Sequence, residues 1–195
     1  MSIREILAPW LKDWAIDDPS VLAGWIDRMR RRTLAPGSIL VRSGQTCHSI
    51  YLLQSGLLRL YYVDAEGRER NKAFYGAGAI TGPVSAILSE SRASFTIEAL
   101  EPTICIEADL LMLMQLAPHH PPISRLVIKL LSDAFTRNEQ REALLLTCNA
   151  EQRYRWLLEH QPDLAGRIPQ YHIASYLGID AVSLSRLKRK LDNDG

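Results

Sequence analysis

The spacing of apolar residues changes twice along the chain and divides it into three regions. Up to about residue 33, apolar side chains recur at helical spacing, as in Ile3, Ile6, Leu7 and Trp10. We expect two helices here, the second ending in the basic run at residues 28–32, because cations stabilise a helix C-terminus. Contact of these arginines with phosphate is the alternative.

From Leu34 to about Ile106 the period is two, and glycines separate short apolar runs. The run Leu57–Val63, followed by Asp64–Arg68, predicts a strand that enters a hairpin turn. Short antiparallel strands with frequent turns are typical of a compact sandwich or barrel. The middle region is therefore predicted to be all β.

Helical spacing returns after residue 122 and continues to Leu146. A long connecting helix with an apolar stripe must bury it, and pairing of two copies about a two-fold axis is the simplest way. Packing on the protein's own barrel is the alternative. The predicted dimer interface consists of five residues on one face: Leu126, Val127, Leu130, Leu131 and Ala134. Asn149 and Gln152 have the spacing of a capping box, so a hinge is expected at residues 147–149.

The segment Ile168–Leu191 has the pattern of two short helices joined by a tight turn. Ala174 is small where the helices would cross, and Gly178 stands where the turn requires a positive φ. From Ala181 to Leu191 there are four cations and no acidic residue. Such a helix suits the phosphates of a DNA major groove, although a helical hairpin with a solvated basic face is the alternative.

Specific contacts follow from the chemistry of these side chains. Arg186 can bind a guanine edge through two hydrogen bonds, Ser183 and Ser185 can bind bases or phosphate, and Lys188 and Arg189 suit phosphates. Three residues open the first helix and are expected to contact the DNA backbone: Gln170, Tyr171 and His172.

Length and composition restrict the class of protein. A chain of 195 residues allows one large and one small domain, and the net charge of +1 requires any nucleic-acid contact to come from a local basic face. Three scattered cysteines indicate neither a disulfide framework nor a zinc site. No apolar run is long enough for a signal peptide or membrane span, so we expect a cytoplasmic protein that does not contact membranes.

The order of barrel, long helix and helix-turn-helix resembles the Crp/Fnr family of bacterial transcription regulators. The similarity covers nearly the whole chain, and its most specific pieces are Leu34–Gly37, Gly44, Tyr51-x-Leu-x-x-Gly56, Arg59, Gly67, Ser94–Ala99, Arg153-Tyr and Ile168–Ile179. It implies an α+β fold: an N-terminal double-stranded β-helix, or jelly-roll-like β-roll, flanked by helices, a long dimerisation helix and a C-terminal winged-helix-type helix-turn-helix. The corresponding boundaries are 1–115, 116–146 and 147–195.

Family members that bind cyclic nucleotides carry a glutamate for the ribose and an arginine for the phosphate. The positions that match these residues hold Pro83 and Ala93, and Arg92 is one residue out of register. A shift of one residue on a strand turns a side chain to the other face. We therefore predict that cyclic AMP does not bind, and that any effector in the β-roll would contact Gly82, Arg92 and Ser94.

Other cofactors of the family are not expected either. An iron-sulfur sensor needs four cysteines, and the haem candidates His48, His119 and His120 are chosen only for being histidines. A metalloenzyme with this barrel needs a strand with His-x-His or a His-x-acid pair, and residues 34–106 contain none. We expect no metal, no cofactor and no enzyme activity.

The resemblance implies a homodimeric regulator that binds a two-fold operator in double-stranded DNA and contacts RNA polymerase. In nucleotide-responsive relatives an Arg, a Glu and a second Arg read bases, and the matching positions here are Ala181, Val182 and Arg186. The operator should therefore differ from theirs. The alternative function is a regulator or receptor gated by an unidentified small molecule, a cyclic nucleotide included, in the β-roll.

Overall fold

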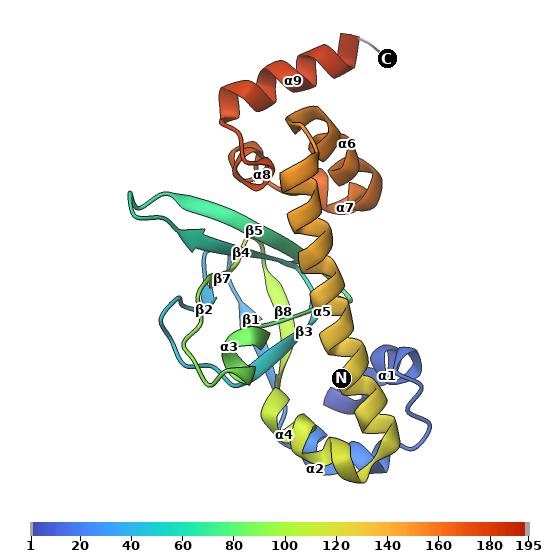
Figure 1. Ribbon diagram of the computed structural model, residues 1–195. Coiled ribbons are helices and arrows are strands. Elements are labelled where there is room, and N and C mark those ends of the chain that lie inside the picture. Colours follow the sequence, from blue (N-terminus) through green and yellow to red (C-terminus); the bar gives the residue numbers. More distant parts are fainter. Residues whose placement is uncertain (1, 194–195) are drawn as a thin grey trace.

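The computed structural model describes residues 2–193, apart from the side chains of Leu164, Asp192 and Asn193. A β-roll occupies the middle of the molecule, and one long helix passes along it from the N-terminal helices to a group of C-terminal helices (Figure 1). The predicted α+β fold is confirmed.

The N-terminal segment begins with α1 (Ile3–Asp13), followed by the 3-10 turn η1 (Pro19–Leu22) and the short helix α2 (Ala23–Ile26). Ser2 and Glu5 form a capping box at the start of α1. The apolar face of α1 buries Ile6, Leu7 and Trp10 in a core that also contains residues of α2 and of the long helix.

The predicted end of a helix at residues 28–32 is wrong. Residues Arg30–Leu34 form strand β1, which pairs antiparallel with β8 (Thr103–Asp109). Arg32 donates a hydrogen bond to Glu107 of β8 at 2.8 Å. The backbone of β8 and this carboxylate, both distant in sequence, offer the arginines a partner that local periodicity cannot show.

Two antiparallel four-stranded sheets form the β-roll, in the orders β1-β8-β3-β6 and β2-β7-β4-β5. The remaining strands are β2 (Ile39–Val41), β3 (Ser49–Ser55), β4 (Leu57–Val63), β5 (Glu69–Gly76), β6 (Ile80–Thr81) and β7 (Thr96–Ala99). The predicted hairpin is β4 and β5. Gly56 joins β3 to β4 at φ 99°, and a side chain there would lie 2.2 Å from the Thr103 hydroxyl oxygen, so only glycine fits.

Three helical segments connect the β-roll to the long helix: α3 (Val84–Leu88), α4 (Leu110–Leu116) and the 3-10 turn η2 (Ala117–His119). The long helix α5 spans Pro121–Thr147, as the periodicity predicts. Its first turns bury Ile123, Leu126 and Val127 in the core that α1 and α4 share. This part of α5 therefore belongs to the N-terminal domain.

The C-terminal helices are α6 (Ala150–His160), α7 (Pro162–Ala165), α8 (Gln170–Leu177) and α9 (Ala181–Asn193). The capping box of Asn149 and Gln152 is confirmed at the start of α6, and Gly178 has φ 72° between α8 and α9. Among the described residues after Thr147 there is no strand, so the wing implied by the resemblance is not found there.

Two β-roll residues, Leu57 and Phe74, are buried in the same apolar cluster as Tyr154, Leu177 and other C-terminal residues. The C-terminal helices thus pack directly on the β-roll. Residues 2–193 contain no helix that is both long and apolar enough to cross a membrane.

Candidate nucleic-acid interface

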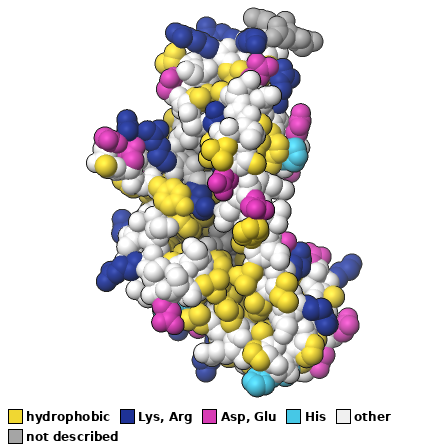
Figure 2. Space-filling view, in the orientation of Figure 1, with side chains coloured by type: hydrophobic (Ala, Val, Ile, Leu, Met, Phe, Trp, Pro, Cys, Tyr) yellow, Lys and Arg dark blue, Asp and Glu magenta, His cyan; other side chains and the backbone are white. Residues whose placement is uncertain are grey.

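Helix α9 presents a basic surface at one end of the molecule. Ser185, Arg186 and Arg189 are exposed, and the space-filling view shows Lys and Arg side chains gathered over this end (Figure 2). Lys188 is half-buried, and its ammonium group donates to the Gln170 side chain at 3.1 Å. Five of the predicted contact residues therefore lie at this end: Gln170, Ser185, Arg186, Lys188 and Arg189.

Ser183 has a different role from the one expected. Both its backbone N–H and its hydroxyl donate to the Asp180 carboxylate, at 2.7 and 3.0 Å. These hydrogen bonds from Ser183 lower the pKa of Asp180 and cap the first turn of α9. Sequence reasoning missed Asp180, although an aspartate directly before a predicted helix is a common N-cap signal.

The start of α8 divides into two faces. Gln170 is exposed and the Tyr171 side chain is 62% exposed, so both can reach a ligand outside the molecule. His172 is only 5% exposed and lies against the β-roll. The expectation that His172 contacts the DNA backbone is wrong for this arrangement, because its ring is already covered by β4 and β5.

His172 is part of a polar group that we call the Arg59 cluster: Arg59, Asn71 and His172, which are buried, with the half-buried Glu98 and the exposed Glu69. Arg59 is 5% exposed and donates to Glu69 at 2.5 Å and to Glu98 at 2.7 Å. Its guanidinium also lies 3.3 Å from Nδ1 of His172, while the Asn71 amide lies 3.1 Å from the same nitrogen and donates to the His172 carbonyl.

Two donors facing one ring nitrogen require that nitrogen to be an acceptor, so the His172 proton is on Nε2. Burial, reinforced by the positive charge of Arg59, lowers the pKa of His172 to about 4. His172 is therefore neutral near pH 7. The Arg59 cluster joins the first helix of the helix-turn-helix to the β-roll through neutral and charged hydrogen bonds.

Two further contacts hold α8 to the rest of the chain. Ser175 of α8 donates to the Glu69 carbonyl and accepts from the Asn71 backbone N–H, both at 3.0 Å. Arg141 of α5 donates to the Tyr176 carbonyl, and its guanidinium stacks 3.8 Å from the Tyr176 ring centre. The orientation of α8 is thus determined by both the β-roll and α5.

The predicted effector residues are not brought together. Gly82 lines a cavity between α1, β6 and α5, and a side chain there would lie 3.0 Å from the Ser49 carbonyl oxygen. Arg92 is exposed and donates to the Gly44 carbonyl at 2.9 Å, and Ser94 is exposed as well. Neither Arg92 nor Ser94 lines that cavity.

The predicted dimer stripe lies on the inner face of α5. Leu126 and Val127 are 1% and 8% exposed within a single chain, so the prediction that they form the interface is wrong. Leu130 and Leu131 pack partly on the same core, and Ala134 lines the cavity beside α1. The stripe was identified correctly as apolar, but the protein's own core already covers its most apolar part.

A second apolar row on α5 is exposed. Ile128, Phe135 and Leu146 are 64%, 63% and 77% exposed and are spaced by seven and eleven residues. These spacings correspond to about two and three helical turns, so the three side chains share one face, opposite Leu126 and Leu130. Sequence reasoning missed this row because polar residues separate its members, although the spacing was visible.

The cyclic nucleotide-binding domain model matches residues 31–120, which contain all of the β-roll except its first residue, Arg30. Regulatory protein HlyX of Actinobacillus pleuropneumoniae is 25% identical over 177 residues, covering 85% of this chain and 73% of that protein. The Fumarate and nitrate reduction regulatory protein of Vibrio cholerae is 27% identical over 169 residues, covering 81% and 67%.

A crystal structure from Eubacterium rectale, described as a transcriptional regulator of the Crp/Fnr family, superposes with a TM-score of 0.71 at 19% identity. It covers 93% of this chain and 87% of the other. The chain is thus similar in sequence to bacterial regulatory proteins and in fold to a regulator of the Crp/Fnr family. In this chain, the helix-turn-helix is α8 and α9, and the cyclic nucleotide-binding-type domain is the β-roll.

The two positions that the resemblance aligns with the charged residues of a nucleotide cassette hold uncharged side chains, Pro83 and Ala93. Pro83 is the N-cap residue of α3, and Ala93 is 2% exposed among apolar residues such as Phe95. A phosphate placed there would be buried without a cation, and burial of an unpaired charge costs more than the about 2 to 7 kcal/mol of an unpaired neutral polar group.

Proposed function

We propose that the protein is a homodimeric transcription regulator that reads DNA with α9. The observation that carries this proposal is the exposed row of Ser185, Arg186 and Arg189 on a capped helix, with Gln170 and Lys188 beside it. Phosphate-binding cations flank a residue that can recognise guanine, which is the composition of a recognition helix. The proposed DNA-binding domain is 147–195.

Homodimerisation is supported by the exposed row of Ile128, Phe135 and Leu146 on α5. An apolar row of this length is costly to leave in water, and pairing of two α5 helices about a two-fold axis would cover it. A dimer of this kind places two α9 helices against successive major grooves, so operator half-sites should be about 10 base pairs apart or a multiple of that. Contact with RNA polymerase remains a prediction.

Selection of DNA from a random pool tests the proposal, because a Crp/Fnr-type dimer should enrich a two-fold sequence. On that operator, Arg186→Ala should weaken binding about tenfold or more, whereas binding to random DNA should change little, since one good base contact contributes about 1 to 3 kcal/mol of discrimination. Lys188→Ala should lower affinity for both and reduce the salt slope by about one unit.

Arg28→Ala is the matched control, because it removes one exposed positive charge far from α9 along the chain. Its affinity for the operator should equal that of the unmodified protein. Equal losses on operator and random DNA for Arg186→Ala would show that Arg186 contacts only phosphate. Failure to enrich any two-fold sequence would contradict the proposed function.

The second candidate function is a regulator gated by a small molecule. The observation that favours it is the cavity that Gly82 lines between α1, β6 and α5. Its walls come from α1, the β-roll and α5, and a later residue of α5, Arg141, contacts α8.

A further inference from the structure

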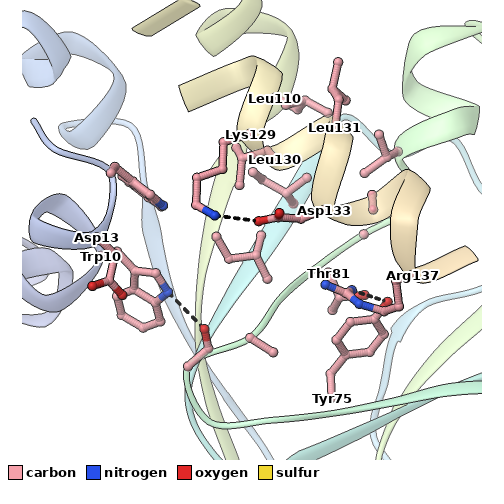
Figure 3. A pocket seen from close by; sticks show the side chains of 18 residues that line it. Trp10, Asp13, Tyr75, Thr81, Leu110, Lys129, Leu130, Leu131, Asp133 and Arg137 are labelled. Atoms are coloured by element: carbon pink, nitrogen blue, oxygen red, sulfur yellow. Dashed lines mark hydrogen bonds and ion pairs between the residues drawn. The ribbon is translucent and has the colours of Figure 1, made fainter. Parts of the chain in front are cut away.

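A cavity of about 260 Å³ lies between α1, the β5–β6 end of the roll and α5, and we call it the α1–α5 cavity. Figure 3 shows Trp10 and Asp13 on the α1 side and Tyr75 and Arg137 on the opposite side. Much of the wall is apolar, from Ile50, Val84, Leu110, Leu130, Leu131 and Ala134. Its volume is slightly below the roughly 300 to 1,000 Å³ of sites for drug-sized ligands, which suits a smaller molecule.

Thr81 is the first indication that this cavity holds a ligand. Its side chain lines the cavity and is 5% exposed, yet its hydroxyl has no hydrogen-bond partner among the described residues. Buried hydroxyl groups nearly always have a partner, because leaving one unsatisfied costs about 1 to 3 kcal/mol. The oxygen is covered in this conformation, and rotation of the Thr81 side chain into the cavity would let a polar atom of a ligand satisfy it.

Arg137 is the second indication. Its guanidinium donates to the Tyr75 hydroxyl at 2.7 Å and lies 4.8 Å from the centre of that ring, but no carboxylate of the described residues is within ion-pair distance. The other cation of the cavity, Lys129, is already paired with Asp133 at 3.0 Å. Arg137 therefore has a charge and further donors available for an anion.

The wall opposite Arg137 is rigid and aromatic. The Trp10 indole donates to the Gly78 carbonyl at 3.2 Å, which fixes the plane of its ring (Figure 3). Asp13, on the same side, disfavours a second negative charge on a ligand. A molecule with one carboxylate and one flat apolar body matches both sides.

We propose that the α1–α5 cavity binds a small aromatic monocarboxylate as the effector of this regulator, with its carboxylate on Arg137 and Thr81 and its ring against Trp10. Arginine binds carboxylates through two parallel hydrogen bonds, and the threonine hydroxyl can donate a third. This assignment rests on the second candidate function, a regulator gated by a small molecule, and it names the chemical class of that molecule. The residues lining the cavity include no histidine or cysteine, so a haem or iron-sulfur group has no such ligand there.

The position of Arg137 provides a connection to the DNA-binding helices. Arg137 and Arg141 are four residues apart on α5, so both lie on one side of the helix, and Arg141 holds the Tyr176 carbonyl of α8. A ligand that draws Arg137 toward Thr81 acts on the same helical segment that orients α8. Effector binding should therefore change operator affinity. Such coupling requires only that the ligand binds one orientation of α8 more tightly than another.

Calorimetric titration with benzoate and phenylacetate, up to millimolar concentration, tests the site directly. Both acids should bind with saturation, and the matched neutral amides, benzamide and phenylacetamide, should bind at least tenfold more weakly. Arg137→Met and Thr81→Val should each reduce acid affinity at least tenfold, while Arg92→Gln, in the cassette region, should leave it unchanged.

Ala134→Leu provides an independent variant, because it fills the cavity without removing a polar group. It should abolish acid binding and keep or raise the melting temperature, which also serves as the folding control for the other variants. Absence of binding by both acids, equal binding of the amides, or loss of binding in Arg92→Gln alone would each overturn the proposal.

Operator affinity, measured with and without the acid, separates the two proposals. Acid binding without any operator would contradict the proposed DNA-binding function and leave the site intact. Operator binding without acid binding would contradict only the site. Acid binding that leaves operator affinity unchanged would overturn the effector role.

Discussion

Arg59 shows how a single residue can serve two parts of the fold. It is buried on β4, neutralises Glu98 of β7, and contacts the His172 ring of α8. Removing one member of a buried charge pair is costly because the other charge stays buried without a partner. The residue therefore stabilises both the β-roll and the docking of the C-terminal helices.

We expect Arg59→Met to lower the free energy of unfolding by about 3 kcal/mol, because the side chain of Glu98, which is 15% exposed, loses its cation. Urea unfolding followed by circular dichroism measures this. Arg68→Met is the matched control: Arg68 is 60% exposed and pairs with Asp64 on the surface, so its loss should cost less than about 1 kcal/mol. Equal effects of the two substitutions would contradict a structural role for the Arg59 cluster.

The buried ring of His172 predicts a pH dependence with a definite sign. Its pKa is about 4 in the folded protein and about 6.5 in the unfolded chain, so between these values the unfolded chain binds more protons. Stability should fall as pH decreases from about 6.5 toward 4, because a protonated Nδ1 would face the donors of Arg59 and Asn71.

His172→Gln keeps a polar side chain of similar size that does not titrate. The urea midpoint of the unmodified protein should fall between pH 7 and pH 5 by more than that of His172→Gln. Asp64, whose pKa is lowered to about 2 chiefly by hydrogen bonds from Arg68 that outweigh burial, titrates in both proteins and cancels in the difference. Equal pH dependence in the two proteins would show that His172 is not buried in solution.

Helix α5 has two apolar faces, of which one is buried within the chain and the other is exposed. The face with Leu126 and Val127 completes the core with α1 and α4, and the face with Ile128 and Phe135 is exposed. Most of the stability of a helix within a protein comes from the packing of its apolar face rather than from helix propensity. The first face provides that packing within the chain, and the second is available to a partner.

We expect Phe135→Glu to convert the dimer to monomers, because a charge in an apolar helix pair loses its hydration. Sedimentation velocity at micromolar concentration measures the mass. Thr136→Glu is the matched control: it adds the same charge at an exposed neighbouring position, about 100° around the helix, and should leave the dimer intact. A monomeric unmodified protein at this concentration would contradict the proposed dimer.

At the scale of the whole molecule, three parts meet along α5. The N-terminal core covers its beginning, the α1–α5 cavity lies along its middle, and Arg141 connects its later turns to α8. The Arg59 cluster joins α8 to the β-roll separately. Any change in the orientation of the helix-turn-helix must therefore alter contacts with both α5 and β4–β5.

We expect that cyclic AMP neither binds appreciably to the β-roll nor changes operator affinity. Pro83 and Ala93 stand at the positions that the resemblance assigns to the ribose acceptor and the phosphate cation, and Arg92 donates to the Gly44 carbonyl on the surface. Calorimetry with millimolar cyclic AMP measures this, and no saturable heat is expected. Saturable heat that is lost in Arg92→Ala would show that the exposed arginine reaches the phosphate.

The sequence by itself determined those features that depend on neighbouring residues. The strand–turn spacing of residues 34–106, the capping box at Asn149 and the turn at Gly178 are all present in the structure. Each follows from side-chain periodicity or backbone freedom within a few residues, which needs no knowledge of distant segments. The basic composition of α9 is likewise visible in the sequence, since few residues of that helix are buried.

Only the tertiary structure decided which surfaces are covered. Residues 28–32 suggested a helix end, but pairing with β8 makes part of this run a strand, and the core takes the face of α5 expected to form the dimer. His172 is buried because Arg59 and Asn71, about a hundred residues earlier, offer its ring hydrogen bonds. Burial depends on what distant segments bring to the same place, and local periodicity contains no information about that partner.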